Sequence, residues 1–229
     1  MVNLNNLTLN TNLIKKGLGI LGGSFDPIHL GHTQSAKAVA KELGLAKILL
    51  IPAHISPLKI TPELMPHANS EQRAAMVDIA CHQDALFSCD TRELKREGHS
   101  YTVETLKELK IQYPNRPLHF IIGMDSLITF TQWHQYQEIL SLCHLVVNTR
   151  PNHTLDNINI ETIALLDNHQ TTDITQLSKV EAGNIFFAKP NFYDISSTQI
   201  RQKIAQDQAC NNQLIPEILD YIDKNKLYR

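Results

Sequence analysis

The sequence predicts an α/β fold in which helices cover both faces of a parallel sheet. Two observations support this prediction. Several short runs of residues are almost entirely apolar, as in strands buried on both faces, and helical patterns alternate with these runs. The chain has 229 residues, 42% of them hydrophobic, which is enough for one large domain with a sizeable core. We expect that domain to span residues 17–229.

Five apolar runs are expected to form the strands of the sheet. They are residues 18–21, 48–51, 120–122, 145–147 and 185–187. Glycines follow the first and third runs, and a proline ends the second, so each of these strands leads directly into a turn. Ligands of open parallel sheets bind outside the carboxyl ends of the strands. The segments that follow these runs are therefore the first candidates for a binding site.

Helices are expected where apolar residues recur at helical spacing. These groups lie within residues 36–43, 75–80, 103–109, 200–204 and 215–222. Gly44 is expected to end the first helix, and Asn69 or Ser70 to cap the second.

Two segments fall outside this pattern. Residues 152–183 are polar and lack a clear period, so we expect a long surface excursion with one short helix. Residues 1–16 are expected to be a loose N-terminal extension, with an added strand or an interface arm as the other interpretation.

Composition excludes several classes of protein. A net charge of −2 gives no basic surface for nucleic acid or for an anionic membrane. The four cysteines form no Cys-x-x-Cys pair, so neither a zinc site nor a redox motif is indicated, and sparse cysteine fits the cytoplasm. No signal peptide and no apolar stretch of about 18 residues is present, so a transmembrane helix is not expected. The sequence leaves open whether the chain forms a homo-oligomer.

Residues 22–32, Gly-Gly-Ser-Phe-Asp-Pro-Ile-His-Leu-Gly-His, carry the strongest chemical signal. Gly22 and Gly23 allow backbone amides to approach a ligand closely. His29 and His32 lie three residues apart, which places both on one side of a starting helix, where free N–H groups and the helix dipole attract anions. This arrangement predicts a pocket for a polyphosphate. The alternative is a glycine turn with one capping and one core histidine.

This string resembles the His-x-Gly-His signature of a nucleotidyltransferase superfamily. The resemblance implies a Rossmann-like, doubly wound parallel sheet and an attack by a phosphate on the α-phosphate of a nucleoside triphosphate, with release of pyrophosphate. It also implies catalytic roles for His29 and His32. The residues that it places against ATP here are Gly22, Gly23, Ser24 and Phe25.

A second segment, residues 195–201, resembles the other signature of the same superfamily, a hydroxyl-rich helix start that ends in arginine. Hydroxyl groups at a helix start can cap the helix or bind phosphate, and Arg201 can reach the same anion with a rigid fork of donors. The alternative is a simple helix cap. The resemblance implies a catalytic role for Arg201 and ATP contacts from Ile195, Ser196, Ser197 and Thr198.

Nearly the whole chain, residues 19–228, resembles the nicotinate-nucleotide adenylyltransferase branch of this superfamily. Residues 121–125 are similar to its Gly-x-Asp segment, which implies that Gly123 and Asp125 contact the adenosine ribose, although Asp125 could instead cap a helix. Trp133 matches a tryptophan that stacks on the pyridine ring, with core packing as the alternative. The other acceptor residues implied are Lys59, Thr102, His134 and Arg150. His134 stands where tyrosine is common.

The resemblance therefore implies adenylyl transfer from ATP to nicotinate mononucleotide in NAD biosynthesis, with Mg²⁺ arriving on ATP and no dedicated metal site. Donors around Thr102 and Trp133 favour a carboxylate over an amide, because only the acid gains charge-assisted hydrogen bonds. Two rivals remain at this point. One is another acceptor on the same fold, such as nicotinamide mononucleotide or phosphopantetheine. The other is a regulatory module that binds ATP without turnover.

Overall fold

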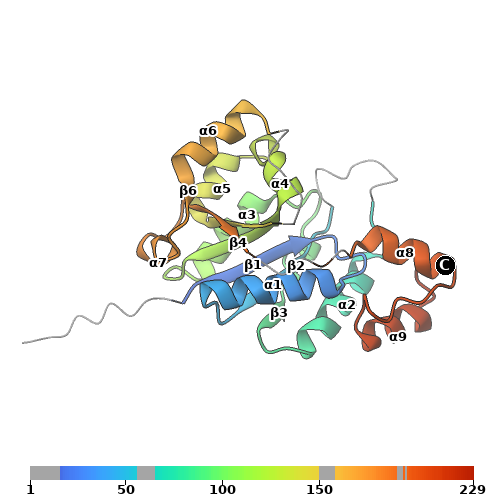
Figure 1. Ribbon diagram of the computed structural model, residues 1–229. Coiled ribbons are helices and arrows are strands. Elements are labelled where there is room, and N and C mark those ends of the chain that lie inside the picture. Colours follow the sequence, from blue (N-terminus) through green and yellow to red (C-terminus); the bar gives the residue numbers. More distant parts are fainter. Residues whose placement is uncertain (1–15, 56–64, 150–157, 190–192, 194) are drawn as a thin grey trace, which may run out of the picture.

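Seven parallel strands form one sheet at the centre of the molecule (Figure 1). The computed structural model describes residues 16–55, 65–149, 158–189, 193 and 195–229. The strands are β1 (Leu18–Gly23), β2 (Ile48–Pro52), β3 (Phe87–Cys89), β4 (Leu118–Gly123), β5 (His144–Asn148), β6 (Gln170–Thr171) and β7 (Ile185–Ala188). Their order is β3-β2-β1-β4-β5-β7-β6, and every neighbouring pair is parallel. The order reverses between β1 and β4, as in a doubly wound sheet.

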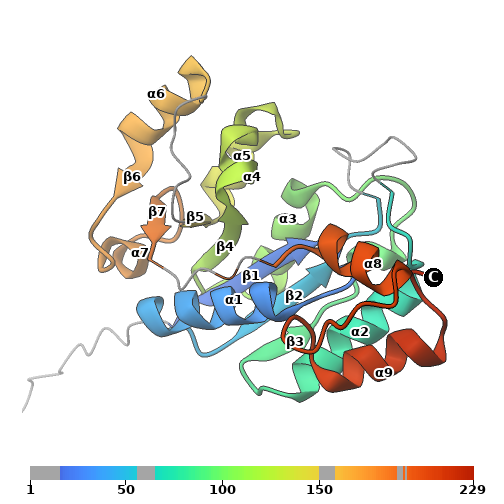
Figure 2. The same ribbon diagram turned by 45° about the vertical axis from the view of Figure 1, so that its right-hand side comes forward.

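Helices cover both faces of this sheet (Figures 1 and 2). They are α1 (Leu30–Leu43), α2 (Ser70–His82), α3 (Thr102–Gln112), α4 (Met124–Ile128), α5 (Tyr136–Leu142), α6 (Ile160–His169), α7 (Gln176–Lys179), α8 (Ser197–Ala205) and α9 (Pro216–Lys224). Two short 3-10 helices, η2 (Glu93–Lys95) and η3 (Phe130–Gln132), precede α3 and α5. One core joins the sheet to α1, α2, α7, α8 and α9, and a second joins it to α3, α4, α5 and α6.

Alternation along β2 shows how one strand serves both cores. Ile48 and Leu50 belong to the core beneath α1 and α2, whereas Leu49 and Ile51 belong to the core beneath α3. All four side chains are at most 5% exposed. A strand covered on both faces needs apolar residues at every position, which is the continuous pattern seen in the sequence. The predicted doubly wound α/β fold is confirmed.

Local signals fix the helix ends as the sequence predicted. Gly44 ends α1 in the left-handed conformation, with φ of 64°. Asn69 caps α2, where its side chain accepts from the backbone of Gln72 and the Gln72 side chain accepts in return. Both boundaries need only neighbouring residues, so they can be read from the sequence.

The segment expected to be a surface excursion is more ordered than predicted. Its described part, from residue 158, contains α6, β6 and α7, where one short helix was expected. Thr162 and Leu166 are buried in α6, but Ile160 is 81% exposed, and this mixture hides the helical period. β6 extends the sheet by pairing with β7 over only two residues, too few for a periodic signal.

Two remaining predictions about the chain concern its start and its location. Residues 1–15 lie outside the part of the chain that the structure describes. Within the described part, none of the helices combines the length and the apolar character needed to cross a membrane.

Candidate active site

A cavity of about 770 Å³ opens at the carboxyl ends of the central strands. Its lining includes Gly22 and Gly23 at the end of β1, Gly123 at the end of β4 and Asn148 at the end of β5. β1 and β4 are the neighbours at which the strand order reverses. The cavity therefore lies where a doubly wound sheet is expected to bind its ligand.

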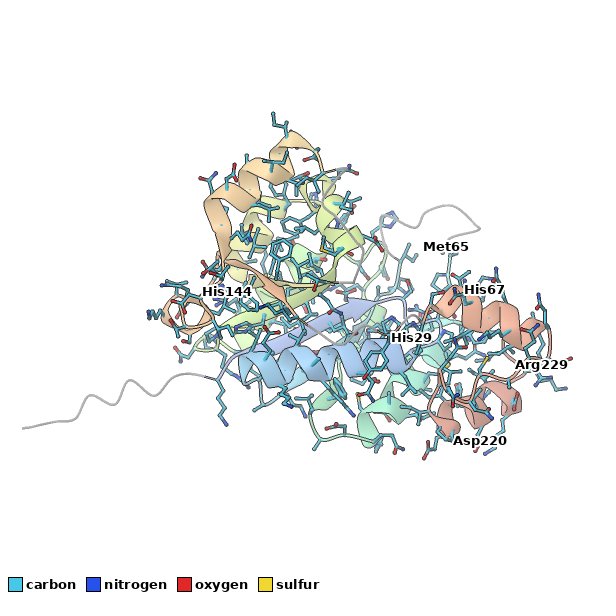
Figure 3. The ribbon with its side chains drawn as sticks, viewed as in Figure 1. His29, Met65, His67, His144, Asp220 and Arg229 are labelled. Carbon is cyan, nitrogen blue, oxygen red and sulfur yellow. The ribbon has the colours of Figure 1, made fainter. Side chains whose placement is uncertain are left out.

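His29 and His32 line this cavity at the N-terminal end of α1, where Figure 3 shows His29. Their rings stack, with 3.7 Å between centroids and 26° between planes. The backbone N–H of His29 donates to Nδ1 of His32 over 3.3 Å. Because Nδ1 accepts this bond, the neutral His32 ring carries its proton on Nε2 and can donate from that nitrogen.

Gly31 is required for this arrangement of the histidines. A Cβ atom at residue 31 would lie 2.9 Å from Nδ1 of His29 and 3.4 Å from Cβ of Ile195. Any other residue would push the ring or the segment before α8 away. The glycine thus lets two distant segments, the start of α1 and the start of α8, meet at one side of the cavity.

The loop between β1 and α1 places its side chains in different directions. Phe25 adopts a left-handed backbone, with φ of 49°, and its ring is buried in the core, with 5.1 Å between its centroid and that of the His32 ring. Asp26 is only 3% exposed. Its carboxylate accepts from the backbone N–H groups of His67, at 2.8 Å, and Ala68, at 3.0 Å. The loop after β1 is therefore tied to the segment that precedes α2.

Arg73 braces the same loops from beneath and was not recognised in the sequence. It is 1% exposed, and its Nη1 donates to the carbonyl oxygens of Ser24 (2.7 Å) and Ala53 (2.6 Å). Burial lowers the pKa of this guanidinium, and the nearby charge of Asp26 opposes that effect. A signal existed in the sequence, because Arg73 occupies the apolar face of α2 together with Met76 and Val77.

The start of α8 is attached to the loop that carries the histidines. Ser196 caps the helix by accepting from the backbone N–H of Gln199, at 3.2 Å. Ser197 Oγ donates to the carbonyl of Pro27, at 2.9 Å. Arg201 Nη1 donates to the carbonyl of Asp26 at 2.8 Å and lies 3.6 Å from its carboxylate. The two signature segments, far apart in sequence, are thus in direct contact.

Aromatic rings and the start of α3 form the opposite side of the cavity. Thr102 is the first residue of α3, and its predecessor Tyr101 has its ring centroid 4.6 Å from that of His134. Trp133 packs against Phe120 and Phe130, with centroids 6.2 and 5.6 Å apart. Its Nε1 atom is buried without a hydrogen-bond partner among the described residues. A ligand that fills this side would meet both an aromatic face and a helix start.

Glu93 is a buried carboxyl group in the lining that the sequence did not reveal. It accepts from Thr105 Oγ1 at 2.6 Å, and Arg96 donates to the same hydroxyl at 2.8 Å. Ser100 also bonds to Glu93, and burial raises the pKa of this carboxyl despite these bonds. The group holds the segment before α3, and no local sequence pattern marks it.

The cavity brings most of the expected site residues together. Those in its lining are Gly22, Gly23, Ser24, His29, His32, Thr102, Gly123, Trp133, His134, Ile195, Ser196 and Ser197. Outside the lining lie Phe25, Asp125, Thr198 and Arg201. Asp125 is in the first turn of α4, next to Ser126, which does line the cavity. Lys59 and Arg150 lie outside the described residues.

The charges of the lining define the ligand that it can hold. Among the described lining residues there is no lysine or arginine, and Glu93 is the only carboxylic acid. Four helices begin at the cavity, with His29, Gly123 and Ser196 as caps and Thr102 as a first residue. Anionic groups would therefore be bound by backbone N–H groups, hydroxyl groups and histidines.

Comparisons with known proteins agree with this geometry. A family model described as cytidylyltransferase-like matches residues 20–203, a range that includes both signature segments. The chain is 41% identical over 215 residues to the "Probable nicotinate-nucleotide adenylyltransferase" of Psychromonas ingrahamii, covering 94% of this chain and 98% of that protein. It is 42% identical over 217 residues to the protein of the same name from Aeromonas salmonicida, covering 95% and 99%. The chain belongs to the nicotinate-nucleotide adenylyltransferase family.

A solved structure of another adenylyltransferase shares this fold. The Plasmodium falciparum nicotinic acid mononucleotide adenylyltransferase, in a structure complexed with APC, superimposes with a TM-score of 0.68. The match covers 93% of this chain and 97% of that one at 18% identity. At this identity the match concerns the fold, and the doubly wound sheet of this adenylyltransferase is the shared feature.

Proposed function

We propose that this chain transfers the adenylyl group of ATP to nicotinate mononucleotide, forming nicotinate adenine dinucleotide and pyrophosphate. One observation carries the proposal. A single cavity of about 770 Å³ has the two histidines and the start of α8 on one side, and Thr102 and Trp133 on the other. That volume falls within the range of about 300–1,000 Å³ common for ligand sites. The names of the relatives support the same reaction, which is a step of NAD biosynthesis.

The reaction we propose is a direct in-line attack. The 5′-phosphate oxygen of the acceptor attacks the α-phosphorus of ATP, the bond to the β-phosphate oxygen breaks, and pyrophosphate leaves with that electron pair. A phosphate monoester is already anionic near neutral pH, so the attacking oxygen needs no strong general base. Catalysis then consists of positioning and of stabilising the charge that develops on the phosphates.

His29 and His32 are the proposed catalytic donors. Neutral His32 has its proton on Nε2, because Nδ1 is engaged by the backbone of residue 29. A donor held in this way can strengthen its bond to a phosphate oxygen as charge develops, without having to reorient. Arg201, whose guanidinium donates to the carbonyl of Asp26, is proposed as a third donor to the phosphates on this side of the cavity.

The other ATP contacts divide by their place in the structure. Backbone groups of residues 22–24 and 195–197 line the cavity and are proposed to surround the triphosphate. Gly123 and Asp125 are proposed to contact the ribose, with Asp125 acting from the first turn of α4. Phe25 and Thr198 support their neighbours: Phe25 through its contact with His32, and Thr198 through the bond it accepts from Arg201 at 3.4 Å.

Mg²⁺ is proposed to arrive with ATP. In phosphoryl-transfer sites Mg²⁺ is bound mainly through phosphate oxygens and water, so the proposed cation needs no dedicated set of protein ligands. When bound there, the cation would neutralise part of the phosphate charge, while the residues of this chain position the phosphates.

The acceptor is proposed to bind between Thr102 and Trp133, with its pyridine ring on the indole. Its carboxylate would accept from the Thr102 hydroxyl and from backbone N–H groups at the start of α3 and near His134. An amide would direct its NH₂ donors at these donors. Glu93 lies in the same lining, where burial raises the pKa of its carboxyl group. Contacts from Lys59 and Arg150, the cytoplasmic location and any homo-oligomer stay predictions.

Paired steady-state assays test the function. We expect the acid mononucleotide to exceed its amide by well over tenfold in kcat/KM at saturating Mg-ATP, since each unpaired buried group costs about 1–3 kcal/mol. Thr102→Val should reduce this preference, and Thr102→Ser, which keeps the hydroxyl, should retain it. Equal constants for the two acceptors, or a preference for the amide, would contradict the proposed acceptor.

A third acceptor, phosphopantetheine, tests the rival on the same fold. If pyrophosphate is released from ATP with phosphopantetheine and with neither pyridine mononucleotide, phosphopantetheine is the acceptor and the proposed acceptor is wrong. Binding of ATP without pyrophosphate release with any of the three acceptors would instead indicate a regulatory module.

A further inference from the structure

The C-terminal tail of the chain reaches the phosphate side of the cavity through a buried carboxylate. Tyr228, which follows α9, donates from its hydroxyl to Oδ1 of Asp26 over 2.8 Å. In both ribbon views the C-terminus lies beside α8, the helix that carries Arg201 (Figures 1 and 2). Residues at opposite ends of the sequence are thus joined within the loop that precedes the histidines.

Asp26 is the point at which four segments meet. Oδ1 accepts from Tyr228 and from the backbone of Ala68, at 3.0 Å. Oδ2 accepts from the backbone of His67 at 2.8 Å and lies 3.6 Å from Nη1 of Arg201. Because Nη1 of Arg201 also donates to the carbonyl of Asp26, the position of the guanidinium depends on the orientation of residue 26.

Strained backbone in the tail accompanies this contact. Lys226 and Tyr228 have φ of 51° and 64°, a left-handed conformation that L-residues rarely adopt. Leu227 between them is only 8% exposed and packs in the core, and its backbone N–H donates to Ile222 at 3.0 Å. The tail is therefore folded back so that the Tyr228 hydroxyl points inward. Strained backbone that the surrounding structure holds in place is common at functional sites.

Tyrosine suits this position chemically. Burial raises the pKa of Tyr228, and the negative charge of Asp26 raises it further, so the hydroxyl stays protonated and donates. A neutral donor fixes the carboxylate without cancelling its charge. That charge remains available to hold the Arg201 guanidinium.

We propose that Tyr228 is a positioning residue for Arg201, acting through Asp26 so that the guanidinium faces the phosphates of ATP. The inference rests on the proposed function for the identity of the ligand. It predicts an effect on the ATP side of the cavity and none on the acceptor side, where Thr102 and Trp133 belong to other segments. A tyrosine that only anchors the tail would change stability instead.

The first experiment compares two tyrosine hydroxyls of the C-terminal region. Tyr228→Phe keeps the ring and removes the bond to Asp26, and we expect kcat/KM for ATP to fall about tenfold, as for loss of one hydrogen bond to a charged group. The KM for nicotinate mononucleotide should stay within twofold. Tyr221→Phe on α9 is the matched control and should leave both constants unchanged. Unchanged kcat/KM for ATP in Tyr228→Phe would overturn the proposal.

A double-mutant cycle then tests whether the effect passes through Arg201. Arg201→Lys keeps the charge and removes the fork of donors, and Tyr228→Phe in that background should cost less than twofold. An equal cost in both backgrounds, or a lower unfolding temperature with unchanged kinetics, would show that Tyr228 only anchors the tail. The affinity for ATP, measured by calorimetry without any acceptor, should follow the same cycle. That measurement separates this inference from the choice of acceptor, which could be wrong on its own.

Discussion

One pair of histidines lies at the edge of the sheet where the strands have their carboxyl ends. A second pair lies at the opposite edge, where the strands have their amino ends. His29 and His32 follow the carboxyl end of β1, whereas His119 and His144 lie side by side near the amino ends of β4 and β5. Figure 3 shows His29 and His144 far apart at these opposite edges. The first pair stacks at 3.7 Å and lines the large cavity, and the second pair has ring centroids 5.3 Å apart in the interior.

Hydrogen bonding separates the two pairs. Nδ1 of His144 accepts from the backbone of Asn184 at 3.2 Å, and its Nε2 therefore donates to the carbonyl of Val180 at 3.1 Å. Both ring nitrogens are thus used to hold the segment before β7. In the other pair, Nδ1 of His32 accepts from the backbone N–H of His29, and the ring lines the cavity.

Burial also sets the acid–base behaviour of the interior pair. Burial, together with the neighbouring His144, lowers the pKa of His119 to about 4. The pKa of His144 is lowered by burial too. The same side chain is therefore a neutral structural group where the core encloses it, and a candidate ligand-binding group where a helix start and a cavity meet it.

His32→Ala should have the largest effect, and it should break only the carboxyl-edge pair. We expect turnover to fall by about 10² to 10³, because one donor to the developing phosphate charge is lost. The free energy of unfolding should change little, since His32 is only partly buried. The measurements are steady-state kinetics and urea unfolding, with the exposed His82→Ala as control. Turnover within twofold of wild type would sink the catalytic assignment.

His119 at the amino edge should show the opposite behaviour, with stability affected and chemistry unchanged. Its folded-state pKa of about 4 lies below the ordinary 6.5, so the neutral ring contributes stability that is fully present above pH 6.5. That contribution is lost as the pH falls from 6.5 towards 4, because the unfolded chain binds the proton more readily. Between pH 7.5 and 5 the loss should be about 2 kcal/mol.

Urea unfolding at these two pH values measures this loss. His119→Gln cannot titrate and should flatten the pH dependence, while turnover at pH 7.5 stays close to that of wild type. His82→Gln, at an exposed histidine of α2, should keep the wild-type pH dependence. A wild-type slope in His119→Gln would mean that other groups cause the acid sensitivity.

The sequence predicted those strands whose own residues form a continuous apolar run. β2 and the middle of β5, residues 145–147, are unbroken apolar runs because each of their faces meets a separate core. β3 was missed because its three residues include Ser88, and β6 because it has only two residues. Short strands of this kind owe their conformation to the neighbouring strand, which no local pattern reports.

The site was predictable where function follows from position after a strand, and less so where it depends on tertiary contacts. Gly22 lies at the end of β1, and His29 and His32 stand at the helix start that follows the next loop, so their place at the cavity could be inferred. Arg73 was missed because the carbonyl groups that it holds lie 20 and 49 residues away. Phe25 was expected at the ligand, but the left-handed backbone at that residue turns its ring into the core.

Trp133 combines features of the two histidine pairs. Like His119 it packs among apolar neighbours, Phe120 and Phe130, and like His32 it lines the cavity. Trp133→Ala should raise the KM for nicotinate mononucleotide several-fold, since stacking contributes on the order of 1 kcal/mol, and leave the KM for ATP within twofold.

Two further variants at residue 133 distinguish stacking on the pyridine ring of the acceptor from packing in the core. Trp133→Phe keeps an aromatic face and should retain most of the affinity for the acceptor. Trp133→Leu keeps an apolar side chain without a π-face, so it should lose more acceptor affinity than Trp133→Phe does. If Trp133→Leu binds the acceptor as well as Trp133→Phe does, the indole serves packing. An equal rise in both KM values would likewise assign Trp133 to the core, as a counterpart of His119.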